Sequence, residues 1–317
     1  MKAIATDADF LIPQHRAAAM SYLQTLAATG YHYWNTGSVH YEKAAGFLAK
    51  MRALYPIDLS PGQRAVAQAK GRANAYLVMF PDGSKTGYIQ WFLVATRGRH
   101  AVDPLTGELL TDQPFADLIH QREKMKDGHR IPLTWLGHYR LVQHQPVRDP
   151  RKKKSQKRVW TWRLTVETYR QWQLRLEQAA RIGNTALRKE IEPLLRSPMF
   201  SGVRDDIAQL AALAEAAFRK QHKSAAYVSP LPAMLPYMPR VTVYRDGTLF
   251  SLVEQLRQQD ADDKARAMAA SRALLAGAEP RMQFTQSMFM EISNGSSEEE
   301  GGSGAVQGHA AGRSGSA

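Results

Sequence analysis

A short run of cationic side chains at residues 148–158 carries the most distinctive chemistry in this sequence. Seven basic residues and one acid give the run a charge of +6, while the whole 317-residue chain carries +13. The basic residues are Arg148, Arg151, Lys152, Lys153, Lys154, Lys157 and Arg158. Such a density of like charge is relieved by a polyanion, because each cation that meets a phosphate releases a condensed counterion. We therefore expect the run to bind the phosphates of DNA or RNA.

The segments on either side of the run are predicted to be strands, over residues 133–147 and 158–166. The basic run then becomes the tip of a two-stranded arm, a shape that can enter a nucleic-acid groove. Side chains alternate between the two faces of a strand. Polar side chains of these two strands therefore share one face next to the arm. Its members are His138, Arg140, Thr161, Arg163 and Thr165. We expect Arg140, Arg163 and Thr165 to add contacts to the same nucleic acid.

Trp160 and Trp162 fall on the opposite face of the last strand. We interpret them as core residues, since tryptophan buries a large apolar ring. The alternative is an open face on which bases stack.

A central antiparallel sheet is predicted to hold the arm. Two strand-like runs, at residues 75–80 and 88–96, flank an Asp-Gly turn and predict a β-hairpin. Together with the two strands of the arm they make a sheet of about four strands, with helices on one face. The predicted fold class is therefore α+β, with a basic hairpin arm.

Helices are predicted on both sides of this sheet in sequence. Apolar spacing predicts two antiparallel helices over residues 10–52, with an aromatic packing cluster at their junction. The members of that cluster are Tyr31, Tyr33, Trp34 and Tyr41. Ser60-Pro61 starts a further helix that ends by Gly71. The other predicted helices cover residues 112–125, 169–182, 186–191, 203–222, 249–259 and 263–275. The helix at 186–191 is expected to end or kink at Pro193. A short strand is predicted over residues 240–244.

These elements predict four regions. They are a helical N-terminal region at 1–72, the sheet with its basic arm at 73–167, a mainly helical C-terminal region at 168–293, and a disordered tail at 294–317. The tail is Gly, Ser, Ala and Glu with almost no bulky apolar residue, so it cannot bury enough surface to offset its ordering entropy.

Residues 163–166, followed by predicted helices at 169–182 and 186–195, resemble the ribbon-helix-helix DNA-binding fold. The resemblance covers about 35 of the 317 residues. It implies a homodimeric transcriptional regulator whose strand reads the major groove through Arg163 and Thr165, with Leu164 and Val166 inward. Pro193 and the partner strand at 133–147 depart from the family's pattern.

The composition as a whole is Cys-free, rich in Ala and Arg, and mixes Trp with Arg. It resembles that of uncharacterised proteins of bacterial plasmids and conjugative elements, without a match to one family over the full length. The resemblance implies an accessory or regulatory role on a mobile element.

An enzyme is the alternative of a different class. Ten histidines are present, and His129, His138 and His144 suggest metal-free cleavage of RNA by general acid–base chemistry. No HExxH, phosphate loop, GxSxG elbow or carboxylate pair at metal spacing occurs, and the absence of cysteine excludes thiolate metal sites. We therefore favour a binding protein over an enzyme, and expect neither a metal nor a cofactor.

The longest apolar runs are far shorter than the roughly 20 residues of a membrane helix. The first residues lack the apolar core of a secretory signal. We therefore expect a cytoplasmic nucleic-acid-binding protein that does not contact membranes, with DNA favoured over RNA.

Overall fold

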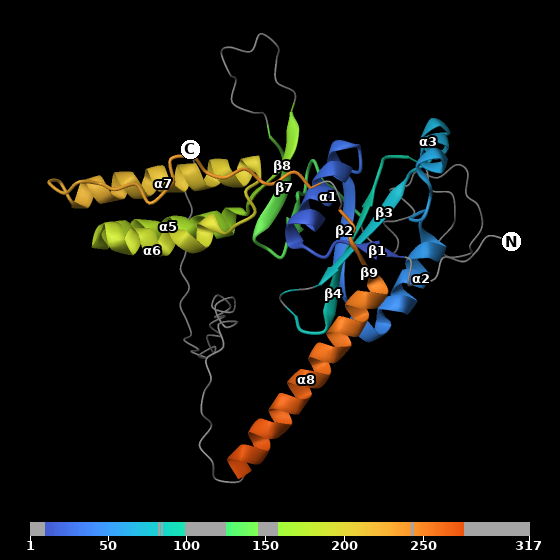
Figure 1. Ribbon diagram of the computed structural model, residues 1–317. Helices are drawn as coiled ribbons and strands as arrows, with labels where there is room; N and C mark the ends of the chain where they lie inside the picture. The colour runs from blue at the N-terminus through green and yellow to red at the C-terminus, as the bar shows by residue number, and fades with distance from the viewer. Residues whose placement is uncertain are drawn as a thin grey trace, which may run out of the picture. The chain divides into compact units, whose positions relative to one another are not determined.

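Figure 1 shows a computed structural model that describes residues 10–81, 83, 85–98, 125–144, 158–241 and 244–275. The predicted α+β class is confirmed, and every strand pair among these residues is antiparallel. The chain divides into two compact units, Met1–Lys264 and Ala265–Ala317. All described strands and helices belong to the first unit, apart from the last turns of the final helix.

The strands form three sheets. Their bounds are β1 Leu11–Ile12, β2 Tyr33–His40, β3 Ala75–Pro81, β4 Tyr88–Ala95, β5 Lys126–Asp127, β6 Leu133–Trp135, β7 Tyr139–His144, β8 Val159–Leu164 and β9 Gly247–Thr248. The orders are β3-β4-β2-β5, β6-β7-β8 and the pair β1-β9.

The helices are interleaved with these strands along the chain. They are α1 Arg16–Ala28, α2 Ala44–Leu54 after the short turn η2 Tyr41–Lys43, α3 Pro61–Ala69, α5 Val166–Ile182, α6 Asn184–Leu195, α7 Ser201–Gln221 and α8 Leu249–Leu275. The Ser60-Pro61 start of α3 is confirmed, because Ser60 and Gln63 form a reciprocal capping box.

The four-stranded sheet is buried on both faces. The predicted hairpin is confirmed as β3 and β4, and alternate residues of these strands enter two separate cores. Val78 and Phe92 join a core with α1 and the three-stranded sheet, whereas Leu77 and Met79 join a core with α2 and α8. The expectation of helices on one face only was wrong. The apolar residues of β3 and β4 follow one another without alternation because both faces of these strands are buried.

The two helices expected over residues 10–52 are confirmed as α1 and α2, but the stretch between them, which was expected to be a turn, is strand β2. β2 pairs with β4 along its whole length. Its aromatic and β-branched residues suit a strand, and the helical spacing holds only for α1 and α2. The aromatic residues do pack, but in different cores: Trp34 is buried in the core with α1, and Tyr41 in the core with α2.

A single strand was expected over residues 133–147, and that prediction was wrong. That stretch turns at Leu136 and Gly137, both with positive φ, and folds into the hairpin β6–β7. β8 confirms the last predicted strand and pairs with β7. Trp160 and Trp162 are buried as predicted, and the Trp162 indole nitrogen donates to the Met20 carbonyl oxygen at 2.8 Å.

The C-terminal helices follow the sequence pattern with two corrections. α6 carries Pro193 in its last turn and ends soon afterwards, close to the expected end. The two helices expected at 249–259 and 263–275 are one helix, α8, whose junction is bridged by a Lys264–Asp260 ion pair. Arg240, Val241 and Tyr244 are not in a strand, contrary to prediction. Residues 112–124 and 294–317, for which a helix and a tail were predicted, lie outside the described residues.

Candidate nucleic-acid interface

The predicted basic arm joins two strands whose ends meet. His144, the last residue of β7, pairs in register with Val159, the first of β8. β7 therefore ends and β8 begins at the same point of the sheet, and residues 145–157 lie between them in sequence. Arg158 is exposed at this point. The other basic residues of the arm, Arg148, Arg151, Lys152, Lys153, Lys154 and Lys157, lie outside the described residues.

A broad hollow of about 730 Å³ opens beside Arg158. One wall comes from the C-terminal end of α1 and the following turn, including Thr25 and His32. The facing wall comes from the paired strands, including Gln143 and Trp160. Among the described residues, no Asp or Glu lines this hollow, so its charged lining is cationic.

A second hollow, of about 370 Å³, shares Gln24 and Thr25 of α1 with the first. Its cations are Arg204, from the first turn of α7, and Arg240, from the proline-rich segment that follows α7. Tyr237 lines it as well. No carboxylate from the described part of the chain lines this hollow either. The two hollows therefore form one cationic surface across α1, which we call the α1 groove.

Contacts with α1 and α7 hold the proline-rich segment in place. The Tyr244 ring stacks on Tyr22 at 5.4 Å between centroids, and the Thr25 hydroxyl donates to the Tyr244 hydroxyl oxygen at 3.2 Å. The backbone nitrogen of Met238 donates to the carbonyl oxygen of Met199. These bonds place Tyr237 and Arg240 at the groove although the segment has no regular secondary structure.

The arginines of the α1 groove have no acidic partner in the part of the chain that the structure describes. Arg158, Arg204 and Arg240 form no ion pair with the described residues. The Arg204 guanidinium instead lies 3.7 Å from the centroid of the Tyr237 ring, and its Nε has no hydrogen-bond partner in the part of the chain described. Sequence reasoning missed Arg204, Arg240 and Tyr237, because no spacing connects a helix start with an irregular segment about 35 residues later.

Two histidines meet at the edge of the groove. His129 Nε2 lies 2.9 Å from His32 Nδ1, and His32 Nε2 lies 3.1 Å from the carbonyl oxygen of Ala27. A carbonyl oxygen only accepts, so Nε2 of His32 donates and its Nδ1 accepts from His129 when both rings are neutral. Burial lowers the pKa of His32, and the neighbouring His129 lowers it further. Sequence analysis singled out His129 but not His32.

The polar face predicted beside the arm is covered only in part: Thr161 is buried, Arg140, Arg163 and Thr165 are half-buried, and His138 is exposed. Its members do share a face, since Arg140 pairs with Arg163 and Val142 with Thr161. The first turns of α7 lie against it, and Thr161 is fully buried there. The prediction of an accessible surface at Thr161 was therefore wrong.

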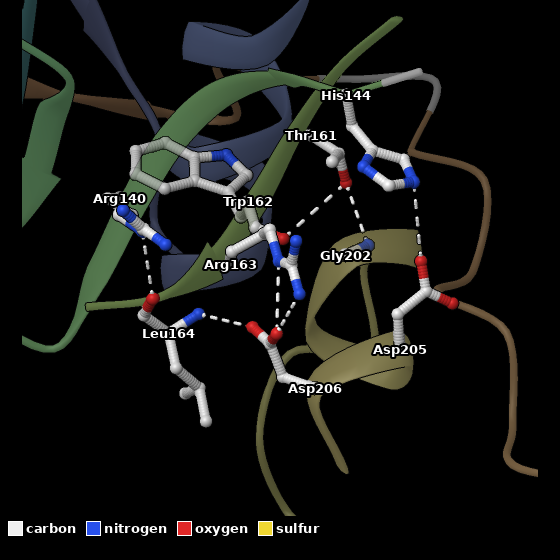
Figure 2. Close-up of polar contacts among 9 residues, drawn as sticks. All are labelled: Arg140, His144, Thr161, Trp162, Arg163, Leu164, Gly202, Asp205 and Asp206. Atoms are coloured by element: carbon white, nitrogen blue, oxygen red, sulfur yellow. Dashed lines mark hydrogen bonds and ion pairs between the residues drawn. The ribbon is translucent and has the colours of Figure 1, made fainter. Parts of the chain in front are cut away.

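Figure 2 shows how this face is joined to α7. Asp206 is buried and accepts from the Arg163 guanidinium and from the backbone nitrogen of Leu164, the latter at 2.9 Å. The backbone nitrogen of Gly202 donates to the Thr161 hydroxyl at 3.0 Å. The bond to Asp206 raises the pKa of Arg163. We call this group the Asp206 joint.

The remaining predicted contact residues also bond within the chain. Arg140 Nε donates to the carbonyl oxygen of Leu164 at 3.2 Å. Thr165 caps α5 by accepting from the backbone nitrogen of Thr168, and its hydroxyl lies 2.9 Å from the carbonyl oxygen of Gly137. The structure thus brings together Arg140 and Arg163 on the small sheet and Thr165 at the start of α5 just after it, and each takes part in holding the fold.

No protein-family model matches this chain, and neither curated proteins nor solved structures give a significant match. Within the described residues, no cluster of three His, Asp or Glu side chains could hold a metal ion. None of the described helices has the length and apolar character needed to cross a membrane.

Proposed function

We propose that this protein binds nucleic acid through phosphates, in the cytoplasm, using the basic arm at 148–158 together with the α1 groove. The observation that carries the proposal is a set of three arginines, Arg158, Arg204 and Arg240, that have no ion-pair partner among the described residues and lie on a surface to which those residues contribute no carboxylate. An unpaired arginine offers five donors in a planar fork that suits phosphate oxygens.

Charge and position support the same proposal. Arg158 belongs both to the predicted arm and to the wall of the first hollow. A polyanion that meets the arm therefore also meets the groove, and long-range attraction to a chain of charge +13 steers it there. Arg163 and Thr165 have no role in this proposal, because both bond inside the chain.

DNA is the favoured partner over RNA, and an accessory or regulatory role on a mobile element is the biological setting we propose. The setting rests on the composition, while the mode of binding rests on the groove. Binding through phosphate contacts does not depend on the base sequence.

A salt titration of DNA and RNA binding tests the proposal. The observed affinity should fall steeply as salt rises, because each phosphate contact releases a counterion. Replacing Lys152, Lys153 and Lys154 with alanine should reduce the slope of log affinity against log salt by about two to three. Failure of the wild-type protein to bind any nucleic acid at low salt would end the proposal.

Metal-free cleavage of RNA is a second candidate, favoured by the hydrogen-bonded pair His32 and His129 at the groove edge. A neutral imidazole in such a pair can accept a proton from an attacking hydroxyl. Labelled RNA incubated with the protein in a chelator should be cut by the wild type and not by His129→Ala. Intact RNA with both proteins would remove this candidate and leave binding unaffected.

A further inference from the structure

We propose that the α1 groove binds single-stranded nucleic acid, with a base stacked on the exposed ring of Tyr237. This inference rests on the proposed function and names the form of nucleic acid that the groove takes.

The shape of the groove favours a single strand over a duplex. Hollows of about 370 and 730 Å³ are in the size range that encloses small ligands. Proteins read a duplex with elements that protrude into its grooves, and a concave surface does not protrude. A single strand has splayed bases that can enter hollows, while its backbone follows a cationic groove.

Tyr237 has the features of a stacking platform. Tyr237 is 65% exposed, although contacts hold the segment that carries it at the groove. The Arg204 guanidinium packs over the ring at 3.7 Å from the centroid, which fixes the ring and places a cation next to it. A base stacked on this ring would bring its phosphate close to Arg204 and Arg240. Stacking is tolerant of sequence, because every base has a π-face.

Two polar atoms at the groove also lack a partner. Gln24 Oε1 and Arg204 Nε are buried, and neither has a hydrogen-bond partner among the described residues. Gln24 lines both hollows, and Arg204 lines the smaller one. Both atoms have almost no solvent-accessible surface, so a ligand in the groove would reach them only after the side chain of Gln24 or Arg204 changes its rotamer.

The experiment is fluorescence anisotropy with a labelled oligo-dT strand and a labelled hairpin duplex of equal charge. Tyr237→Ala should weaken binding of the single strand at least about fivefold, the smallest effect expected for the loss of one stacked base. It should leave duplex binding within about twofold. Tyr237→Phe should keep the wild-type affinity, because the ring is retained.

Tyr88→Ala is the matched control, since Tyr88 is an exposed tyrosine that lines neither hollow. It should leave both affinities unchanged. If the wild type binds both nucleic acids and Tyr237→Ala changes neither affinity, the stacking inference is overturned and the proposed function stands. If the wild type binds neither, both fail.

Discussion

The Asp206 joint and the α1 groove both contain arginine, yet the two regions differ in what those arginines contact. In the joint, Arg163 is paired with a buried carboxylate and its charge is neutralised inside the fold. In the groove, Arg204 meets an aromatic ring and no acid from the described residues. The first arrangement fixes a helix against a sheet, and the second leaves a cation for an external anion.

Both regions are built by the first turns of a single helix, α7. Asp206 and Arg204 are two positions apart, and side chains at that spacing do not face each other on a helix. Asp206 points to β8, as Figure 2 shows, and it is buried, whereas Arg204 lines the groove. α7 thus separates a structural carboxylate from a cation that is open to ligand. The helix start is the point where the fold and the proposed site are coupled.

The largest effect is expected from breaking the joint. Asp206→Asn removes the charge that pairs with Arg163 and should lower the free energy of unfolding by roughly 2–4 kcal/mol, somewhat below the usual cost for a fully buried pair because Arg163 is partly exposed. Chemical denaturation measures this change. Asp205→Asn, at the exposed neighbouring position, should cost less than about 1 kcal/mol. Equal effects of the two variants would contradict the assignment of a structural role to Asp206.

A smaller loss is expected when α7 is pushed away from β8. A Cβ atom added at Gly202 would lie 2.5 Å from both the Arg163 Cγ and the Trp162 carbonyl oxygen. Gly202→Ala should therefore lower the free energy of unfolding by about 1–3 kcal/mol. Gly46→Ala is the control, because that site has open space and lies in helix α2. A neutral Gly202→Ala would show that the close approach is not needed.

The smallest effect concerns pH. The pKa of His32 is lowered by burial and by His129. At pH values between this lowered pKa and the ordinary one, His32 is protonated in the unfolded chain and neutral in the folded chain. The contribution of His32 to stability is therefore complete above its ordinary pKa of about 6.5 and declines as pH falls below that value. His32→Gln should flatten this part of the curve of unfolding free energy against pH. An identical slope in the two proteins would contradict the burial of a neutral His32.

The parts of the fold that depend on local chemistry were predictable from sequence. The apolar runs that became β3 and β4, the Ser60 cap of α3 and the face of α7 follow from side-chain type and spacing. β2 was missed because it is held by pairing with β4, more than 45 residues away in sequence, and only Trp34 within it is buried. Local pattern cannot show such a partner.

The candidate site was predictable only in part, for a similar reason. The charge of the 148–158 run is visible in the sequence, but the partner of each arginine is not. Arg163 looked free and is paired with Asp206, while Arg204 and Arg240 carried no local signal and lie together at the groove. Tertiary contacts decide which cations remain available for a ligand.

The most direct test of the central claim compares the salt dependence of single-strand binding in three proteins. Arg204→Ala combined with Arg240→Ala removes both arginines that line the smaller hollow. Arg188→Ala combined with Lys189→Ala removes the same charge from exposed positions on α6 that line neither hollow. The groove variant should show a slope of log affinity against log salt that is lower by about 1.4, at about 0.7 per phosphate contact, while the α6 variant keeps the wild-type slope. Equal slopes for the two variants would contradict the account, because net charge alone would then explain binding.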